Sequence, residues 1–333
     1  MKSKFIFTIL LTCCLLAVLN SSCEKEIDFN NKYKNPKLVL YSLLSTNDSI
    51  EIKLSRSMNI IDNANIITIN DASIEIYEDG QLLPVPVTAK GKGLYTVPYI
   101  PKEGKKYRII ASNEGLKTIE SEVVMPKKPV IREIPINVRT SEEIMNEKTI
   151  NFSLNFDAEL NEDNYYLLKF EYIWPAEHQD YYQRFNDYYY YASIDFSDRV
   201  SARTSGFFNG RQVYFSDEYF NGKNYTFNFS TTNYGMYDIF RHYGYSEVAE
   251  DDNVESFPGY ELKLVVHFAT ISKDFYQFLK SYDDHSEAED MPLSEPVMVK
   301  NNITNGLGIL GAKSVTTDTL TYYVENPFVD ENQ

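Results

Sequence analysis

The chain has 333 residues, which is long enough for two or three domains. It carries 32 Lys and Arg against 48 Asp and Glu, a formal net charge of −16. This balance argues against nucleic acid as a partner, because binding phosphates requires Lys and Arg to displace counterions. It also argues against docking on an anionic membrane through a basic patch. Hydrophobic residues make up 43% and aromatic residues 14%, so the composition argues against global disorder.

The N-terminus has the pattern of an export leader. Lys2 and Lys4 form a short positive region before an apolar run of 15 residues, Phe5 to Leu19. That run has the length of a signal-peptide core and is too short to span a bilayer of about 30 Å. We therefore expect residues 1–22 to be a signal peptide that is not part of the fold.

The end of this leader resembles a bacterial lipobox. Ser21 and Ser22 stand directly before Cys23, although Asn20 occupies the position where lipoboxes usually carry Leu. We expect cleavage before Cys23 and acylation of that residue, because several acyl chains on one residue attach a protein stably to a bilayer. An ordinary secretory peptide cut after Ser22, which leaves a free cysteine, is the alternative.

The remaining cysteines agree with lipid attachment. Of the 3 cysteines, Cys13 and Cys14 lie in the leader, so the mature chain contains only Cys23 and forms no internal disulfide. The sequence Glu24-Lys25-Glu26 resembles the acidic signal that exports Bacteroidetes lipoproteins to the cell surface; a plain solvated linker is the alternative. We expect residues 23–35 to be a polar tether, and the protein to be lipid-anchored in the outer membrane, facing the cell exterior.

Residues 36–126 alternate between apolar and polar side chains in short runs separated by turn residues. About seven strands at this spacing predict an immunoglobulin-like β-sandwich. Asp79-Gly80 predicts a tight hairpin turn, and three prolines in 125–135 predict a linker at 127–135. The expected strands cover residues 37–45, 49–57, 73–78, 81–87, 93–99, 106–112 and 116–124.

Residues 136–333 predict a second, larger antiparallel β domain with one packed helix, so the fold class is mostly β. The helix is expected at 272–283, with Ser272 as its cap. Its apolar face is expected to contain Phe275, Phe278, Leu279 and Tyr282. The expected strands cover residues 149–156, 165–174, 259–271, 306–312 and 314–324.

Seven ordered segments span the mature chain: Cys23–Asp28, Pro36–Leu40, Asp71–Gly80, Gly104–Tyr107, Phe275–Ser281, Ser294–Pro296 and Asn302–Ile309. In their order and spacing they resemble a family of Bacteroidetes outer-membrane lipoproteins catalogued as domain of unknown function 4249. The resemblance implies that the protein is encoded beside a TonB-dependent outer-membrane receptor, and it implies no established reaction. It also implies a glycine-rich motif near the end, of which this chain carries a slightly more polar form.

No catalytic pattern stands out in the sequence. The 4 histidines show no metal-ligand spacing, and no HExxH, CxxC, phosphate-binding glycine loop or GxSxG elbow occurs. We therefore assign no catalytic residue, no metal and no cofactor. His267, in an apolar strand, is expected to be a core or sheet-face residue, and the acidic runs 247–255 and 283–290 are expected to be solvated loops.

The most unusual feature of the sequence is a tyrosine-rich block, residues 165–260, which contains 17 of the 27 tyrosines. Tyrosine gives large, rigid contact area at low entropic cost, so it is enriched at recognition surfaces and sugar-stacking sites. The alternative is that inward tyrosines fill the core. The candidate binding residues are Tyr181, Tyr182, Tyr188, Tyr189, Tyr190, Tyr191, Tyr234, Tyr237, His242, Tyr243 and Tyr245.

These observations favour a non-enzymatic surface lipoprotein that acts as an accessory to a TonB-dependent nutrient receptor. Its expected partners are that receptor and the lipid bilayer, which it contacts through acylated Cys23. Whether it also binds a small molecule, glycan or peptide is open. A structural or adhesive surface module is the second hypothesis, and a hydrolase of glycan or peptide is the third.

Overall fold

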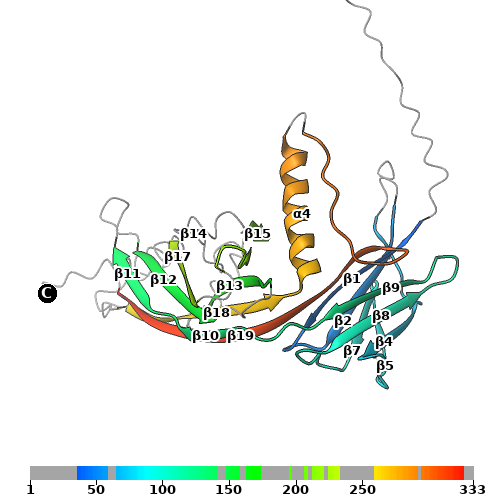
Figure 1. Cartoon of the computed structure of the whole chain (residues 1–333), viewed down its shortest axis with the longest axis horizontal. Helices are drawn as coiled ribbons and strands as arrows, with labels where there is room; N and C mark the ends of the chain where they lie inside the picture. The colour runs from blue at the N-terminus through cyan, green and yellow to red at the C-terminus, as the bar shows by residue number, and fades with distance from the viewer. Residues whose placement is uncertain are drawn as a thin grey trace, which may run out of the picture. The chain divides into compact units, whose positions relative to one another are not determined.

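The protein is described here from a computed structural model. Residues 36–333 group into one compact unit, and the described residues are mostly strand with a single helix, which confirms the predicted mostly-β fold with one packed helix (Figure 1). The structure describes residues 36–58, 65–140, 148–157, 163–173, 195–196, 206–208, 212–220, 224–232, 259–291 and 294–325.

A ten-stranded sheet forms the centre of this unit. Its strands come from both ends of the described chain, because β1 pairs with the C-terminal strand β19. In spatial order the sheet contains β15 (Gly206–Phe208), β16 (Gln212–Ser216), β13 (Tyr165–Ile173), β18 (Gly259–Ile271), β19 (Leu307–Glu325), β1 (Leu38–Ser45), β2 (Ile50–Arg56), β7 (Leu94–Val97) and β6 (Thr88–Gly91), with β3 (Ile67–Thr68) paired to β2.

The expected β-sandwich is present. A four-stranded sheet of β5 (Gln81–Leu82), β4 (Ser73–Glu78), β8 (Lys106–Ser112) and β9 (Ile119–Val124) packs on the β1, β2 and β7 part of the central sheet. Leu40 and Ile52 of one sheet and Ile76 and Ile109 of the other are buried in a common core. Alternation of buried and exposed residues along β1, β2 and β9 is the pattern that predicted these strands.

The Asp79-Gly80 hairpin is confirmed. Both turn residues have positive φ, 49° and 83°, as a primed two-residue turn requires. The second strand of the hairpin is shorter than expected, because β5 ends at Leu82 rather than at residue 87.

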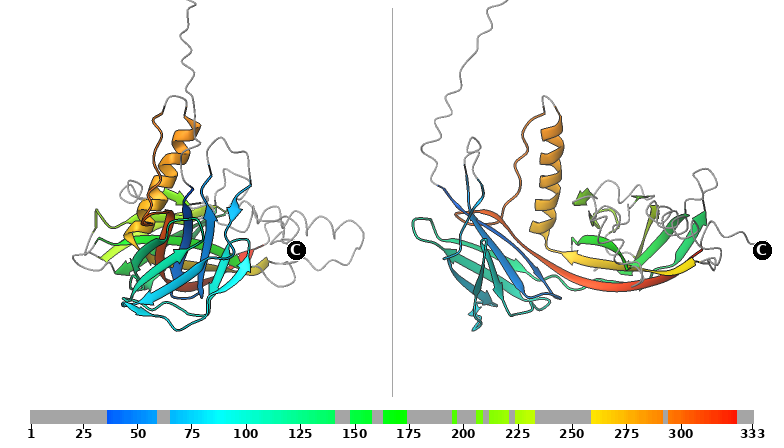
Figure 2. Two further views of the ribbon diagram at one scale, coloured as in Figure 1. Left: turned by 90° about the vertical axis from the view of Figure 1, so that its right-hand side faces the viewer. Right: turned by 180° about the vertical axis from the view of Figure 1, so that it is seen from behind.

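The C-terminal strand differs from the prediction of two strands at 306–312 and 314–324. β19 is one strand of 19 residues: its first part pairs in parallel with β1, and from Lys313 onward it pairs in antiparallel with β18 (Figure 2). Leu310 and Ala312, with Ile303 just before the strand, are buried in the sandwich core. Because β19 changes partner along its length, no turn is needed at Lys313.

A third sheet packs on the other end of the central sheet. It contains β10 (Val130–Glu133), β12 (Lys148–Asp157), β17 (Asn224–Thr232) and β14 (Asp195–Phe196), with β11 (Ile136–Thr140) paired to β12. Phe156 and Phe227 meet Phe215 and Phe268 of the central sheet, with ring centroids 4.8–6.3 Å apart. The strand β10 lies inside the expected linker at 127–135, and the division of the mature chain at that segment stays a prediction.

The helix α4 (Lys273–Asp290) is longer than predicted and includes the acidic run that we expected to be a loop. Phe275, Tyr276 and Leu279 are buried against the central sheet, whereas Tyr282 is 47% exposed. The helix rises from the sheet, so its later turns stand clear of it (Figure 1). Across the described ranges, no helix has both the length and the apolar character that a membrane crossing requires.

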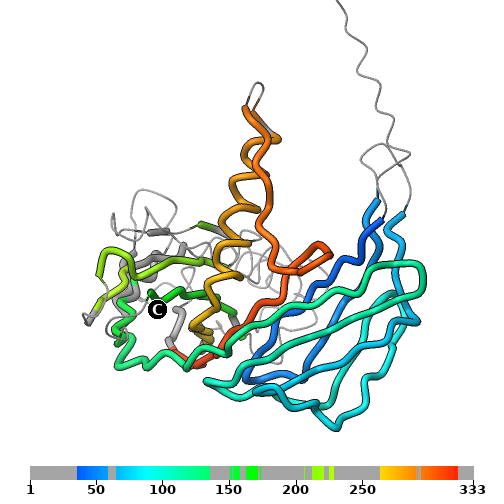
Figure 3. The backbone as a smooth tube through the Cα atoms, turned by 45° about the vertical axis from the view of Figure 1, so that its right-hand side comes forward, coloured from blue at the N-terminus to red at the C-terminus, as the bar shows by residue number. Residues whose placement is uncertain are grey.

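The chain that follows α4 returns beside it and holds these later turns (Figure 3). His285 Nδ1 donates to the Val297 carbonyl at 2.7 Å, and the Lys300 N–H donates to Ser281 Oγ at 2.8 Å. Ser272 occupies the N-cap position, but its side chain makes no capping hydrogen bond: its Oγ accepts instead from the Ala312 N–H at 3.2 Å. The acidic run also contacts the central sheet, where the Tyr214 hydroxyl of β16 donates to Asp283 Oδ2 at 2.7 Å. The run thus has distant partners on the sheet and on the returning chain that sequence pattern alone does not show.

Asn302 and the glycines after it join the helix to both parts of the unit. Asn302 Nδ2 lies 3.2 Å from Asp274 Oδ2 of α4 and donates to the Leu310 carbonyl of β19 at 2.9 Å. Its own carbonyl accepts from Ser121 Oγ of β9 at 2.9 Å. Gly308 has a φ of +110°, and a Cβ there would stand 1.9 Å from the Leu40 carbonyl oxygen. The glycine motif therefore does allow close backbone approach in this chain.

Replacing Gly308 with alanine is expected to destabilise the protein strongly, by about 3 kcal/mol or more, because strain at positive φ adds to a backbone clash. Gly80→Ala is the matched control: Gly80 also has positive φ, +83°, but a Cβ there meets nothing within 4 Å. That variant is expected to lose about 1 kcal/mol. Urea denaturation measures both, and equal losses would contradict the close approach of β19 to β1.

Candidate functional site

A cleft of about 540 Å³ lies where the sandwich, the third sheet and the start of α4 meet; we call it the seam cleft. Its wall on the sandwich side is the extended segment 124–130. Its opposite wall combines residues 163–166, at the start of β13, with residues 270–273, where β18 passes into α4. Gly104 and Asp157 complete the rim. Its volume is within the range of small-ligand sites.

The 124–130 wall is fixed to β19 by side-chain hydrogen bonds. Ser314 Oγ donates to the Pro126 carbonyl at 2.6 Å, and Thr316 Oγ1 donates to the Pro129 carbonyl at 2.7 Å. Prolines have no N–H, but their carbonyls remain strong acceptors. These two bonds therefore hold in place a proline-rich segment that sequence reasoning treated as a linker.

The opposite wall is fixed by a buried pair, Asn164 and Asp217. The Asn164 backbone N–H donates to Asp217 Oδ1 at 2.9 Å, and Asn164 Nδ2 donates to Oδ2 at 2.7 Å. Burial raises the pKa of Asp217, although the hydrogen bonds from Asn164 oppose that change. The pair joins the start of β13 to the end of β16 and so sets the position of the Tyr165 and Tyr166 backbone.

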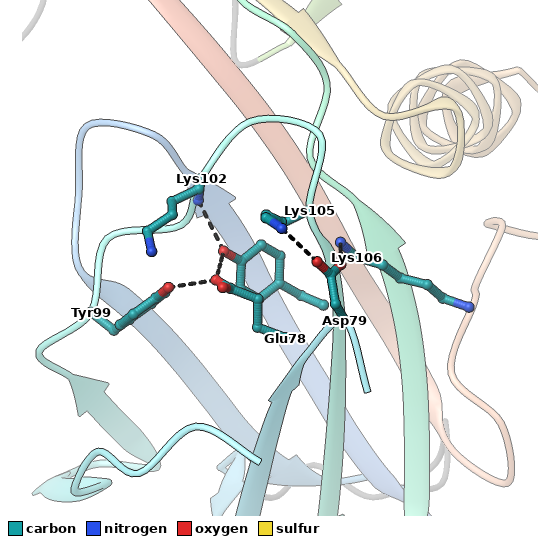
Figure 4. A network of polar contacts seen from close by, with 7 residues as sticks. Glu78, Asp79, Tyr99, Lys102, Lys105 and Lys106 are labelled. Atoms are coloured by element: carbon teal, nitrogen blue, oxygen red, sulfur yellow. Dashed lines mark hydrogen bonds and ion pairs between the residues drawn. The ribbon is translucent and has the colours of Figure 1, made fainter. Parts of the chain in front are cut away.

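A turn at residues 101–105 brings Gly104 to the rim, and a carboxylate holds this turn. Glu78 accepts hydrogen bonds from the hydroxyls of Tyr99 and Tyr107 (Figure 4). The Lys102 N–H donates to the Tyr107 hydroxyl at 2.9 Å, an arrangement like the tyrosine corner of immunoglobulin-type sandwiches. The Gly104 N–H then donates to the Met125 carbonyl at 2.9 Å, which joins the turn to the cleft wall.

The acid next to Glu78 makes its own contacts. Asp79 lies 2.7 Å from Lys105 Nζ and accepts from the Lys106 backbone N–H at 3.0 Å (Figure 4). Burial alone would raise the pKa of Glu78, but hydrogen bonds from Tyr107 and Tyr99, with the charges of Lys102 and Lys105, together hold it below its ordinary value. Glu78 is thus an ionised structural group of the turn.

The seam cleft combines apolar and basic groups. Val124 and Val130 expose 54% and 60% of their surface, and Met125, Pro126, Pro129 and Ile271 also line the cleft. The charged lining residues are Lys127, Lys128, Lys273, Asp157 and Asp163.

Both carboxylates of the seam cleft have a cationic neighbour. Asp157 Oδ1 lies 2.7 Å from Arg132 Nε, and Asp163 Oδ2 lies 3.9 Å from Lys273 Nζ. With its neighbours Arg132 and Glu103 counted, the cleft has four cations against three carboxylates, so it is slightly basic in an acidic chain.

The two histidines that the structure describes, His267 and His285, both make contacts within the fold. His267 lies on the face of β18 with Nε2 3.3 Å from Glu171 Oε2 and Nδ1 3.4 Å from Thr317 Oγ1, as expected for a sheet-face residue. His285 lies in α4, also close to Glu289. Among the residues in the described ranges, no three His, Cys, Asp or Glu side chains gather in a way that could hold a metal ion.

All predicted site residues lie outside the described residues. These are the lipidation site Cys23 and the binding candidates Tyr181, Tyr182, Tyr188, Tyr189, Tyr190, Tyr191, Tyr234, Tyr237, His242, Tyr243 and Tyr245. The seam cleft was not predicted. The signal that could have found its wall is the lysine pair between two prolines, with a valine at each end, in Val124–Val130. Val124 was predicted as the end of a strand, and residues 127–130 were interpreted only as part of a linker.

A family model described as "Domain of unknown function (DUF4249)" matches residues 24–319 of the chain. No curated protein matches it. One similar solved structure is titled "Biofilm associated protein - BSP domain", with 8% sequence identity and a TM-score of 0.25. That alignment covers 88% of this chain and 59% of the other, so the chain spans less than two thirds of it. A TM-score at this level carries no argument about fold or function.

Tyr107→Phe is expected to lower the free energy of unfolding by about 1–3 kcal/mol, because it removes the donor to Glu78 and the acceptor of the Lys102 N–H while it keeps the ring. Tyr77→Phe is the control: the Tyr77 hydroxyl donates to Glu75 at 2.6 Å on the exposed surface. Its loss is expected to stay below about 0.5 kcal/mol. Chemical denaturation of both variants decides whether the Glu78 network holds the turn.

The loss of unfolding free energy in Tyr107→Phe is also expected to depend on pH. The pKa of folded Glu78 lies below its ordinary 4.5, so its ionised form stabilises the fold above that value, and this contribution is lost as the pH falls through the folded pKa. The difference between wild type and variant should therefore be larger at about pH 6 than at about pH 3. A difference that stays constant over this range would show that the charge of Glu78 does not contribute.

Proposed function

We propose that this chain, which belongs to the DUF4249 family, is a non-enzymatic, lipid-anchored binding protein of the outer membrane. In this proposal it faces the cell exterior and is an accessory to a TonB-dependent nutrient receptor. The observation that carries the binding function is the seam cleft, a preformed concave site of about 540 Å³ with apolar and basic lining.

The fixed walls of the seam cleft support binding. Hydrogen bonds from Ser314 and Thr316 hold one wall, and the Asn164–Asp217 pair holds the other. A site that is already formed loses little conformational entropy when a ligand enters. Preformed geometry therefore favours ligand capture.

The anchor and tether set where such a protein can work. In the proposal, acylated Cys23 holds the chain on the outer membrane, and the polar residues 24–35 connect it to β1. Twelve residues span at most about 40 Å when fully extended, so the folded unit stays close to the membrane and to a receptor in it.

The tyrosine-rich residues are the proposed receptor contact. Tyr188 to Tyr191 are consecutive, so side chains of at least two would face outward in a strand of either register. Rigid aromatic side chains of this kind dominate the energetics of many protein interfaces.

A mild-detergent pull-down of the C-terminally tagged lipoprotein from its native envelope is expected to recover one TonB-dependent receptor at near-equal stoichiometry, measured by mass spectrometry. The Cys23→Ser variant is the control, because it lacks the thiol that would carry the lipid. It should leave the membrane fraction and lose the receptor. Recovery of nothing specific by a protein that is lipidated and on the surface would contradict a stable complex and favour an adhesive module.

Alanine substitutions at Tyr188, Tyr189, Tyr190 and Tyr191 are expected to weaken receptor recovery at least tenfold without lowering the melting temperature. Tyr219→Ala, at a described tyrosine that is 52% exposed, is the matched control and should change neither. Loss of folding in the tyrosine series would show instead that these residues fill a core.

A further inference from the structure

We infer that the seam cleft binds a small amphipathic anion, a molecule with an apolar body and one carboxylate or similar acidic group. This inference rests on the proposed binding function and adds the chemical class of the ligand. It follows from three properties of the cleft: its exposed apolar wall, its surplus of cations, and the surroundings of its carboxylates and tyrosines.

The apolar body is expected to lie on the 124–130 wall. Val124 and Val130 are more than half exposed there, and Pro126 lies between them. Because Ser314 and Thr316 fix the backbone of this wall, the valines present a constant surface. Covering that surface removes apolar area from water, which favours binding of an apolar group.

The acidic group is expected to lie near Lys128 and Lys273. Lys128 Nζ has no ion-pair partner among the residues that the structure describes, although the Lys128 backbone N–H donates to Glu103 Oε2 at 3.1 Å. Lys273 Nζ is 3.9 Å from an exposed carboxylate of Asp163. An anion between these two side chains gains attraction from both without displacing a tight pair. The acidic chain as a whole repels anions, so this local surplus of cations is the property that selects the site.

A cationic ligand is expected to be attracted less strongly to the seam cleft than an anion. Asp157 Oδ1 already lies 2.7 Å from Arg132 Nε, and Asp163 Oδ2 lies 3.9 Å from Lys273 Nζ. A cation would have to compete with these neighbours while three lysines repel it.

A neutral sugar also lacks its usual contacts. Sugars commonly stack on exposed aromatic faces, but Tyr166 is 2% exposed. The ring of Tyr165 packs on Tyr276 with centroids 4.7 Å apart. Tyr166 is therefore part of the cleft floor, and Tyr276 takes one face of the half-buried Tyr165 ring, which leaves the valines and lysines as the main recognition groups.

Phenylbutyrate and its uncharged amide, phenylbutanamide, are suitable probes because they share an apolar body and differ in the charge. Isothermal titration calorimetry of the mature lipoprotein in lipid nanodiscs, with empty nanodiscs as the blank, is expected to show binding of the carboxylate at least fivefold tighter than the amide. Equal affinities, or no heat from either probe, would overturn the inference.

The variant Lys128→Gln with Lys273→Gln should weaken phenylbutyrate about tenfold and change the amide less than twofold, because it removes both charges and keeps the apolar wall. Lys117→Gln, at an exposed lysine of the sandwich outside the cleft, is the control and should leave both affinities unchanged. Val124→Asp should abolish binding of both probes. Unchanged binding of phenylbutyrate to the double variant would overturn the inference.

These outcomes are independent of the receptor pull-down. A failed titration beside a recovered receptor would overturn the ligand class and leave the accessory function in place. A clear titration beside an empty pull-down would leave the ligand class in place and contradict the stable receptor complex.

Discussion

The parallel pairing of β19 with β1 is the constraint on which the rest of the structure depends. Residues 307–313 of β19 close the sandwich sheet, and residues 313–325 pair with β18 in the same sheet. One strand thus belongs to both ends of the compact unit. Because the Gly308 backbone lies where a side chain would meet the Leu40 carbonyl, this pairing requires a glycine at that position. Asn302 then ties α4 and β9 to the start of the same strand.

Local sequence pattern predicted many of the strands, but it missed others, such as β16 and β17, and it could not predict how the strands pair. β8 has the expected bounds because its alternation of apolar and polar residues reports which face is buried, and β18 has them because its long apolar run marks a central strand. The partner of β1 lies near the opposite end of the chain, and alternation along one strand contains no information about such a distant partner. For the same reason β19 was predicted as two strands.

The helix and the cleft show the same limit at the level of side chains. The run Asp283–Asp290 is polar enough for a solvated loop, but as a helix it has distant partners: Asp283 accepts from the Tyr214 hydroxyl of β16, and His285 donates to Val297 of the returning chain. The 124–130 wall is rich in proline, a local signal for a linker, and it is fixed only by hydroxyls of β19. In both places the deciding partners are distant in sequence, so propensity and spacing could not identify them.

The position of β19 also explains why a cleft can persist at the seam of two packed layers. Ser314 and Thr316 hold the sandwich-side wall, while β18, which contributes Thr270 and Ile271 to the other wall, pairs along the same strand. Both walls therefore take their position from one β-strand, and the space between them does not depend on a flexible hinge. Close-packed interiors transmit strain rather than absorb it, so closing the cleft would require breaking hydrogen bonds to β19. A concave surface that cannot close without breaking these hydrogen bonds is preorganised. Its residues lose their conformational entropy when the chain folds, so little further entropy is lost when a ligand binds.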